Sequence, residues 1–403
     1  MLKGKCVVVG VCGGIAAYKA AAVVSGLVKL GAEVHVIMTQ AAQEFVGKLT
    51  FQTLSQNLVT DEMFAEPKKW DVEHVELAQK ADLFLVAPAT ANTIAKMANG
   101  IADNMLTCVY LATQAPVLIA PAMNKNMYAH PATVENLQKL AARGCKFVEP
   151  GEGFLACGVT GKGRLSEPEE IIEAVVDEIA YEKDLRGLKV LVSAGATQEP
   201  LDPVRFLTNH SSGKMGYAVA RAAKRRGADV VLVSGKTALA PVRGVKMLQV
   251  GSAQEMHDAI LSQSANCDIV VKAAAVADYT PTQTADQKIK KEDGALTLTL
   301  RRTPDILAEL GRKKPAGQVL VGFCMETQDL LLHAKEKLER KNCDLIVANN
   351  LFTEGAGFGV DTNTVTILSA DGTATEPGNM PKEALAHVIL DMAKEKYDEK
   401  NGL

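Results

Sequence analysis

The same pattern of structural elements begins at two places in the chain. Residues 5–38 and residues 190–234 each begin with an apolar run of strand length, pass through a loop of small residues, and continue into an amphipathic helix and a second apolar run. The loop after the first strand of such a unit is where α/β domains bind nucleotides. The repetition predicts an α/β protein with two doubly wound domains, each built on a mostly parallel sheet.

Length and charge narrow the class of protein. A chain of 403 residues is long enough for two or three domains. Lys and Arg number 44 and Asp and Glu 47, a net charge of −3, which gives no electrostatic basis for nucleic-acid binding or for an anionic membrane surface. No apolar run approaches the roughly 18 residues of a membrane span. We therefore expect a soluble, cytoplasmic protein with no nucleic-acid and no membrane partner.

The cysteines do not form a metal or disulfide pattern. Eight cysteines include no CxxC pair, and none of the seven histidines stands at zinc-ligand spacing from them. They are expected to be reduced thiols, mostly in the core. Cys157 is the exception, because it lies in a glycine-rich segment, residues 149–164, that has no hydrophobic period. This segment is either a lid that closes over a ligand or a linker between domains.

A polar segment at residues 181–187 divides the chain, and domains are predicted at residues 1–181 and 187–403. In the first domain the loop after the first strand has the spacing GxxGG rather than GxGxxG, and it either binds a phosphate or makes a tight turn. Two further apolar strands, residues 83–87 and 117–120, end in proline followed by small or amide residues. Ligands bind at such strand ends in open α/β sheets, so the two ends predict a shared crevice.

The second half alternates strands and helices in the way that predicts a second parallel sheet. Strands are expected at residues 190–193, 230–234, 268–272, 319–323 and 345–348, and helices near residues 215–226, 253–263, 305–313, 329–341 and 382–396. Residues 296–300 and 365–368 are expected to pair as an extra ribbon at the edge.

Three side chains of the first half could take part in chemistry. His74 begins an amphipathic segment before a strand, where a histidine is either a surface or capping residue or a base. Asn124 follows a strand end, where its amide either shapes the turn or holds a ligand. Because Cys157 lies in a glycine-rich segment, its thiol is expected to be exposed, and it could act as an acid or as a redox-active thiol.

In the second half, the sequence SSGKMG resembles a P-loop only superficially. The motif GxxxxGK[ST] requires glycine where Thr208 stands and serine or threonine where Met215 stands. Asp278 ends a strand, where it could meet a ribose hydroxyl or a metal ion. Glu326 either binds magnesium or caps a helix. The lysines of KIKK (288–291), with Lys337 and Lys341, offer point charges to a triphosphate, or else form a solvated face.

Taken together, these motifs resemble two enzyme families. The first half resembles the flavin-dependent cysteine decarboxylases through GGIAAYK, Thr39, EHVELAQKAD, PATANT, APAMN and GFLACGVTGKGR. The second half is similar to phosphopantothenate–cysteine ligases through AGATQEPLDPVRFLTNHSSGKMG, KAAAVADY, KIKK, TPDIL and GFCMET. Both halves in one chain resemble the bifunctional proteins of coenzyme A biosynthesis.

The first resemblance implies a flavodoxin-like flavoprotein domain that uses FMN to decarboxylate phosphopantothenoylcysteine to 4′-phosphopantetheine. His74 would be the base, Asn124 would hold the substrate carboxylate, and Cys157 would return a proton. Flavin is needed because the carbanion left by loss of CO₂ has no electron sink in a cysteinyl group. The FMN site would comprise Gly13, Gly14, Thr39, Pro88, Ala89 and Thr90.

The second resemblance implies that 4′-phosphopantothenate is joined to cysteine with CTP and Mg²⁺, through an acyl-cytidylate. Lys288 would stabilise charge during cytidylyl transfer, and Asn209 with Arg205 would hold the acyl substrate. Asp278 and Glu326 are the candidate Mg²⁺ ligands. The CTP site would comprise Ala273, Ala274, Asp278, Lys288, Pro304, Asp305, Ile306, Leu307, Phe323, Lys337 and Lys341.

The family pattern also implies a homo-oligomer, a dodecamer with trimeric flavin domains and dimeric ligase domains. The chain departs from that pattern at Ala196, Gln198 and Thr303, which leaves the preference for CTP over ATP open. Two other functions compete with the bifunctional enzyme. A nicotinamide-dependent dehydrogenase is disfavoured because neither half contains GxGxxG, and a non-catalytic flavoprotein is disfavoured because His74, Asn124 and Cys157 occur together.

Overall fold

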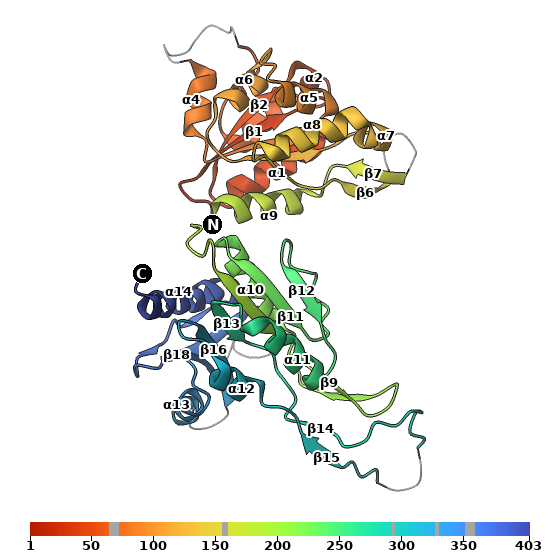
Figure 1. Cartoon of the computed structure of the whole chain (residues 1–403). Coiled ribbons are helices and arrows are strands. Elements are labelled where there is room, and N and C mark those ends of the chain that lie inside the picture. The colour runs from red at the N-terminus through yellow and green to blue at the C-terminus, as the bar shows by residue number, and fades with distance from the viewer. Residues whose placement is uncertain (64–71, 155–159, 292–294, 327–329, 351–358) are drawn as a thin grey trace. The chain divides into compact units, whose positions relative to one another are not determined.

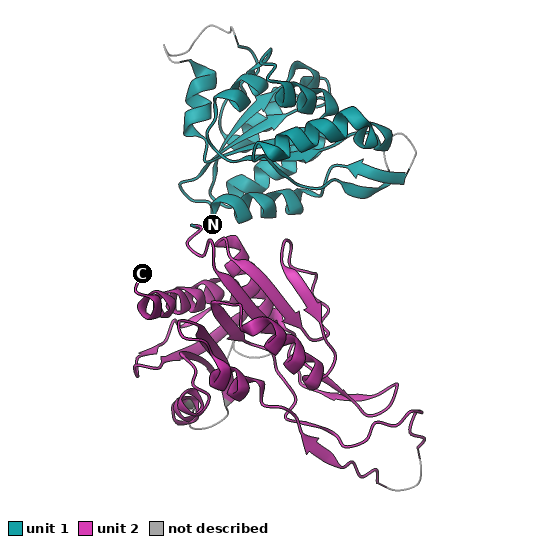
Figure 2. Cartoon of the chain, in the orientation of Figure 1, with its two compact units in different colours: residues 1–182 teal, residues 183–403 magenta. Residues whose placement is uncertain are grey.

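The computed structural model describes residues 1–63, 72–154, 160–291, 295–326, 330–350 and 359–403 (Figure 1). The chain divides into two compact units, Met1–Glu182 and Lys183–Leu403 (Figure 2). The division falls inside the polar segment 181–187.

Unit 1 is built on a parallel sheet with the strand order β2-β1-β3-β4-β5. This is the flavodoxin-like order, in which the chain reverses its direction of winding between β1 and β3. The predicted fold class is confirmed. The strands are β1 (Cys6–Val11), β2 (Glu33–Met38), β3 (Leu83–Ala89), β4 (Val117–Pro121) and β5 (Lys146–Phe147).

Both faces of this sheet are covered, which explains why β1, β3 and β4 are apolar throughout. Val7 and Val9 of β1 belong to the core formed with helices α1, α3 and α9, whereas Val8 belongs to the core formed with α4, α5, α6 and α8. The helices are α1 (Ala17–Lys29), α2 (Gln40–Gln43), α3 (Lys48–Ser55), α4 (Glu73–Lys80), α5 (Ala91–Asn99), α6 (Met105–Ala112), α7 (Lys125–Ala129), α8 (Pro131–Ala142) and α9 (Pro168–Ile179).

The glycine-rich segment of unit 1 forms an antiparallel hairpin. Strand β6 (Gly151–Phe154) pairs with β7 (Thr160–Arg164), and α9 follows within the same unit (Figure 1). The linker interpretation is therefore wrong, because the chain does not leave unit 1 here. Cys157 falls between the two strands, outside the described residues.

Unit 2 contains a sheet of nine strands in the order β12-β11-β8-β13-β16-β17-β18-β19, with β20 paired to β18. From β12 to β17 the strands are parallel, and numbered along the chain their order is 3-2-1-4-5-6, that of a Rossmann fold. The parallel strands are β8 (Lys189–Ala194), β11 (Asp229–Ser234), β12 (Lys246–Gln249), β13 (Ile269–Lys272), β16 (Val319–Glu326) and β17 (Leu345–Asn350).

Helices cover this sheet on both faces as well. One core contains α10 (Lys214–Arg225) and α14 (Lys382–Asn401), and the other contains α11 (Ala253–Ser264), α12 (Ile306–Lys313) and α13 (Leu330–Arg340). The remaining strands are β9 (Gln198–Pro200), β10 (Phe206–Thr208), β14 (Tyr279–Pro281), β15 (Leu300–Arg302), β18 (Thr362–Ser369), β19 (Ala374–Thr375) and β20 (Asn379–Pro381).

The predicted edge ribbon is wrong. Strand β15 pairs with β14 in a small separate sheet, whereas β18 pairs antiparallel with β17 in the main sheet. The two segments differ in environment: β15 is exposed, while β18 buries Val365 and Ile367 in the core. Strand β12 was not predicted, because its short sequence KMLQ carries no alternation strong enough to mark a strand.

Candidate active sites

The loop after β1 in unit 1 has free hydrogen-bond donors. Among the described residues, the backbone N–H groups of Gly13, Gly14 and Ile15 have no acceptor, and they precede the N-terminus of the 13-residue helix α1. Gly13 is also required for packing, because a Cβ there would lie 2.4 Å from the Cβ of Ala41. Unpaired N–H groups and the positive end of a helix, at the switch point between β1 and β3, fit the phosphate of a flavin.

The other residues predicted for the flavin lie at neighbouring strand ends. Thr39 follows β2 and caps α2 by accepting a hydrogen bond from the N–H of Ala42 (3.3 Å). Thr90 follows β3 and caps α5 in the same way through Thr93 (3.4 Å). The carbonyl of Pro88 accepts a hydrogen bond from the N–H of Cys12 (3.3 Å), which joins the ends of β1 and β3. The structure thus brings these residues to one edge of the sheet.

Asn124 lies beside the contact between the β6–β7 hairpin and the turn that follows β4. It caps α7 by accepting a hydrogen bond from the N–H of Asn126 (2.8 Å). The preceding N–H, of Met123, donates to the carbonyl of Gly163 in β7 (2.9 Å). Gly163 has φ of 142°, and a Cβ there would lie 2.4 Å from the carbonyl oxygen of Met123. The hairpin that carries Cys157 therefore packs directly on the turn that carries Asn124.

His74 is the second residue of α4 and is partly exposed. Within the described part of the chain its side chain makes no hydrogen bond or ion pair. The structure places it on a different element from Asn124, and the segment before it, residues 64–71, is not described.

Unit 2 contains a cavity of about 850 Å³. It lies at the carboxyl ends of β13 and β16, beside the loop that leads from β8 into α10 and the start of α12, which is the switch-point region of this sheet. Most residues predicted to bind CTP or the acyl group line it: Asn209, Ala273, Ala274, Asp278, Pro304, Asp305, Ile306, Leu307, Phe323, Lys337 and Lys341. Lys288 and Arg205 do not line it, and the side chain of Glu326 lies outside the described part.

Glycines allow the loop between β8 and α10 to approach the strand. Gly213 has φ of 81°, and a Cβ there would lie 2.8 Å from Cγ2 of Thr237. A Cβ on Gly216 would lie 2.6 Å from the Cβ of Ala194, at the end of β8. These positions hold the N-terminus of α10 against the strand end, so that Ser211, Ser212 and Lys214 face the cavity.

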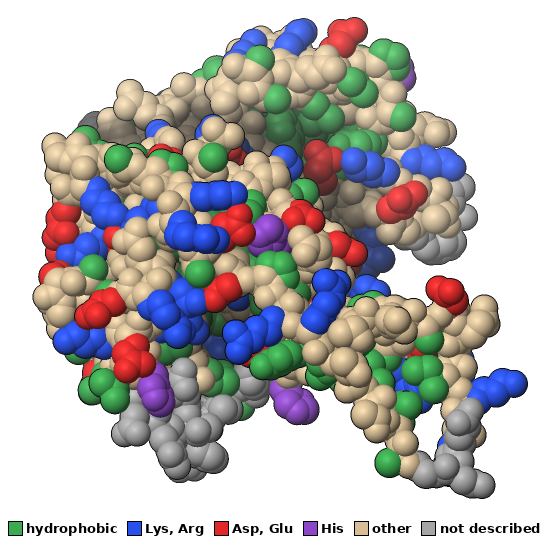
Figure 3. All heavy atoms as spheres, turned by 60° about the horizontal axis from the view of Figure 1, so that its bottom comes forward, with side chains coloured by type: hydrophobic (Ala, Val, Ile, Leu, Met, Phe, Trp, Pro, Cys, Tyr) green, Lys and Arg blue, Asp and Glu red, His purple; other side chains and the backbone are tan. Residues whose placement is uncertain are grey.

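The cavity lining is strongly basic. Its basic members are Lys214, Lys272, Arg302, Lys337, Arg340, Lys341 and Lys382, against the two acidic residues Asp278 and Asp305. Lys341 forms an ion pair with Asp305, and Lys214 with Asp361 (2.7 Å). Lys337 and Arg340 make no ion pair with any residue that the structure describes. Lys and Arg side chains also gather on the surface of unit 2 that Figure 3 turns towards the viewer.

Lys272 is set apart from the other lysines by its surroundings. Its Nζ donates to the carbonyl of Ala274 (2.9 Å), and no carboxylate of the described residues forms an ion pair with it. Burial, and then the neighbouring ammonium of Lys337, lower the pKa of Lys272 to about 8. Such an amine gains a strong electrostatic partner when an anion enters the cavity.

Arg205 binds a neighbouring loop rather than the cavity. Its Nε and Nη2 donate to Oδ2 of the buried Asp202 (3.0 and 2.6 Å), and Nη2 also donates to the carbonyl of Ile289 (2.8 Å). The same carboxylate accepts from the N–H of Ile289 (3.2 Å), and the guanidinium holds the pKa of Asp202 well below its usual range. Arg205 and Asp202 thus fix the backbone beside Lys288.

Comparison with known proteins agrees with this division. Residues 1–180 match the family described as Flavoprotein, and residues 185–397 match the DNA/pantothenate metabolism flavoprotein C-terminal domain. The chain is 52% identical over 393 residues to the coenzyme A biosynthesis bifunctional protein CoaBC of Bacillus subtilis, covering 97% of each chain. It is 46% identical to that of Mycobacterium bovis, covering 96% of each. The chain belongs to the CoaBC family.

Two solved structures are similar to one half each. The C-terminal domain of a CoaBC is 40% identical, with 54% of this chain and 100% of that chain covered and a TM-score of 0.47. The FMN-dependent cysteine decarboxylase SpaF is 31% identical, with 43% of this chain and 99% of that chain covered and a TM-score of 0.38.

Membership of the CoaBC family confirms the enzyme class predicted from the sequence. Proteins of this family join a decarboxylase and a ligase of coenzyme A biosynthesis in one chain, and the N-terminal half is a flavoprotein domain. No helix in the described part of this CoaBC chain is both long and apolar enough to cross a bilayer.

Several residues that line the cavity of unit 2 were not predicted: Lys272, Arg302, Arg340, Asn349, Asn363 and Lys382. Asn349 is 8% exposed, and among the described residues its Oδ1 has no hydrogen-bond partner. It is the next-to-last residue of β17, so the rule that ligands bind at the carboxyl ends of parallel strands was sufficient to find it. Lys382 begins α14, far along the chain, and no local pattern marks it.

Proposed function

We propose that the two units catalyse consecutive steps of coenzyme A biosynthesis in the cytoplasm. Unit 2 joins 4′-phosphopantothenate to cysteine with CTP, and unit 1 decarboxylates the resulting phosphopantothenoylcysteine with FMN to give 4′-phosphopantetheine and CO₂. The observation that carries this proposal is the basic cavity of about 850 Å³ in unit 2. Its size is within the roughly 300–1,000 Å³ of small-molecule sites, and its charge suits a polyanion.

The ligase reaction begins when the carboxylate of 4′-phosphopantothenate attacks the α-phosphate of CTP. An acyl-cytidylate forms and pyrophosphate leaves; the amine of cysteine then attacks the acyl carbon and CMP leaves. Lys337 and Arg340, which have no ion-pair partner among the described residues, are suited to neutralise the triphosphate. Asn209 is held towards the cavity by a hydrogen bond from its Nδ2 to the carbonyl of Ala275 (3.1 Å) and is suited to orient the acyl group.

Lys288 would stabilise the charge that develops during cytidylyl transfer, with Arg205 holding its backbone in position. Asp278 is the carboxylate that we propose for Mg²⁺, because it lines the cavity and makes no ion pair in the described part of the chain, whereas Asp305 is paired with Lys341. Glu326 stays a second proposed ligand.

In unit 1, the free N–H groups of Gly13 and Gly14 would hold the phosphate of FMN, beside Thr39 and the turn Pro88, Ala89 and Thr90. When bound, FMN supplies the electron sink that decarboxylation of a cysteinyl group requires. Asn124 would orient the substrate carboxylate and His74 would take up a proton. Cys157 would return a proton to the product, and the β6–β7 hairpin would keep water from the site.

Two assays on one sample test the proposal. The purified protein should show flavin absorbance in the visible range, and it should release pyrophosphate from CTP only when 4′-phosphopantothenate is present. A colourless protein that FMN cannot reconstitute rejects the first activity. Pyrophosphate release from ATP at an equal rate rejects CTP as the preferred nucleotide. That comparison matters because Thr303, where asparagine is usual, holds the turn before α12 by donating to the carbonyl of Ala277 (2.6 Å).

Cys157→Ser tests the proposed acid. We expect turnover to stall after oxidation of the substrate, so that steady-state CO₂ release falls by roughly 10²-fold or more. Cys108→Ser, which removes a thiol outside the hairpin, is the control and should retain the normal rate. Undiminished CO₂ release by Cys157→Ser would reject the assignment.

The family pattern also supports a homo-oligomer with trimeric flavin domains and dimeric ligase domains, which together make a dodecamer. Light scattering coupled to gel filtration measures the mass directly. A monomer or an isolated dimer in solution contradicts this part of the proposal.

A further inference from the structure

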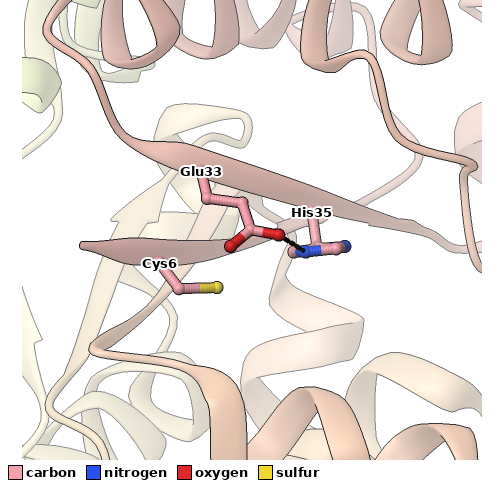
Figure 4. A group of neighbouring side chains, drawn as sticks. All are labelled: Cys6, Glu33 and His35. Carbon is pink, nitrogen blue, oxygen red and sulfur yellow. Dashed lines mark hydrogen bonds and ion pairs between the residues drawn. The ribbon is translucent and has the colours of Figure 1, made fainter. Parts of the chain in front are cut away.

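A second cluster of chemically reactive side chains lies at the opposite end of the unit 1 sheet. Cys6, Glu33 and His35 each offer one ligand atom, and these atoms all lie within 4.8 Å of one another. Figure 4 shows the three side chains together on one side of the paired strands β1 and β2. Neither proposed reaction uses them.

The register of the strands explains why the three side chains meet. Cys6 pairs with Glu33 in the parallel ladder, and Val8 pairs with His35. Residues two apart on a strand project from the same face, so Glu33 and His35 stand side by side and Cys6 stands across from Glu33. The ligands therefore come from two hydrogen-bonded strands, which hold them more firmly than a loop would.

This cluster is separate from the flavin site. Cys6 and Glu33 are the first residues of their strands, whereas the flavin loop follows Val11 at the other end of β1. At roughly 3.3 Å per residue, the length of β1 puts the two sites about 16 Å apart.

From this geometry we infer that Cys6, Glu33 and His35 form a binding site for a zinc-class divalent metal ion. Thiolate and imidazole ligands with one carboxylate suit Zn²⁺ or Co²⁺ rather than Mg²⁺ or Ca²⁺, which prefer oxygen ligands only. Around Zn²⁺, ligand atoms lie roughly 3.3–3.8 Å apart, so side-chain movements of about 1 Å would close the site. Water would take the fourth position.

The cluster is already paired with a positively charged side chain of the protein. The ammonium of Lys80, at the end of α4, lies 2.6 Å from Oε1 of Glu33, and Nε2 of His35 lies 3.0 Å from the same oxygen. A metal ion would replace Lys80 as the partner of Glu33. Binding would therefore remove the ion pair that holds the C-terminal end of α4, the helix whose second residue is His74.

Metal binding must overcome the cost of ionising Cys6. Burial, and then Glu33, raise the pKa of this thiol to about 11; the nearby ammonium of Lys80 opposes this and Asp82 adds to it. The thiol proton passes to solvent when the metal binds, so each binding event releases a proton.

The test uses the full-length, flavin-loaded protein, stripped of metal with a chelator and titrated with Zn²⁺ held at known free concentrations. We expect one zinc ion per chain. Cys6→Ser and His35→Gln should each weaken binding at least tenfold. Lys80→Met, which removes the competing ammonium, should tighten it several-fold. Cys145→Ser, a buried thiol of the same core, is the control and should bind like the unmodified protein.

Equal zinc affinity in Cys6→Ser and the unmodified protein overturns the proposal, as does a Lys80→Met protein that binds no more tightly. If Cys6→Ser does not fold, the Co²⁺ difference spectrum of the unmodified protein decides. A thiolate-to-cobalt charge-transfer band that is weakened in His35→Gln supports the site, and its absence rejects it.

Discussion

At the scale of single residues, Lys272 combines two properties that bear on the binding of an anion. It lines the cavity of unit 2, and it has no carboxylate partner in the part of the chain that the structure describes. Of the other lysines in the lining, Lys214 and Lys341 are paired with aspartates. An anionic ligand bound in the cavity would supply Lys272 with a counter-ion.

This property predicts how nucleotide affinity depends on pH. The pKa of Lys272 is lowered to about 8, and bound CTP should raise it, because the triphosphate favours the ammonium form. The dissociation constant for CTP should consequently increase as the pH is raised above about 8. Lys272→Met should bind CTP about tenfold more weakly at neutral pH and lose this dependence. Titration calorimetry across the pH range measures both effects.

Lys290→Gln is the matched control, because it removes an exposed charge of the KIKK segment outside the cavity lining. It should retain the pH dependence of the unmodified protein. A Lys272→Met protein with unchanged pH dependence would contradict the assignment.

His257 gives a second pH-dependent property, here of stability. Burial lowers the pKa of His257, but its hydrogen bonds to Glu309 (2.8 Å) and Asp258 (2.8 Å) outweigh burial and raise the pKa above 6.5. A raised pKa means that the stabilisation is fully present below about pH 6.5 and is lost as the pH rises through the folded-state value. The melting temperature of His257→Gln should fall below that of the unmodified protein at low pH, and the difference should shrink at high pH. A difference in melting temperature that grows with pH would contradict the conclusion that protonated His257 stabilises the fold.

At the scale of elements, the β6–β7 hairpin depends on two glycines of β7. Gly163 allows the strand to pass the carbonyl of Met123, and a Cβ on Gly161 would lie 2.8 Å from Cδ of Lys125. The five glycines of this segment, which suggested a lid or a linker, are thus partly explained by close packing on α7.

Gly163→Ala should detach the hairpin. The new Cβ would collide with the carbonyl of Met123, and φ of 142° is unfavourable for alanine by about 1–3 kcal/mol. Because Cys157 would be misplaced, decarboxylation should fall roughly 10²-fold while pyrophosphate release stays unchanged. Gly153→Ala, where a Cβ would lie 3.8 Å from Nη1 of Arg164, is the control on the same hairpin and should retain activity. Equal rates for the two variants would contradict the packing argument.

Helices and strands with a clear hydrophobic periodicity could be predicted from the sequence. Strands that depend on pairing with a distant segment could not. Helix α11 was expected at residues 253–263 and is observed at Ala253–Ser264, because its Ser252 cap and its apolar stripe are both local. Strand β15 was paired wrongly because its partner, β14, lies across a long connection and presents only three residues. The hairpin was not recognised as two strands, since glycines carry no side-chain alternation.

The same distinction holds for the sites. Asp278 was found from its place after a predicted strand, whereas Asn209 and Phe323 were named only through the resemblance to the ligase family. Lys382 and Asn363 reach the cavity from α14 and β18, elements whose positions depend on the whole sheet of unit 2. Arg205 was predicted to hold the acyl substrate, whereas its contact with Asp202 could not be seen from their separation of three residues in a loop.

At the scale of the whole molecule, each unit has its own sheet, its own cores and its own site. The two activities should therefore be separable within the intact chain. Lys288→Gln should reduce pyrophosphate release by roughly 10²–10³-fold and leave decarboxylation of added phosphopantothenoylcysteine unchanged.

Asn124→Ser should have the opposite effect, because serine keeps an oxygen for capping α7 but is too short to reach a substrate carboxylate. Asn126→Ser, two residues further on in α7, is its control. If Lys288→Gln or Asn124→Ser abolished both activities, the two sites would be energetically coupled.

The basic lining of the ligase cavity also has a kinetic consequence. The chain as a whole is slightly acidic, so a concentrated positive field at one opening attracts polyanions from a distance while the rest of the surface does not. Salt weakens such a field over about 8 Å at physiological ionic strength. Capture of CTP and 4′-phosphopantothenate should therefore slow as salt is added, which raises KM, whereas kcat, which is measured after capture, should change little.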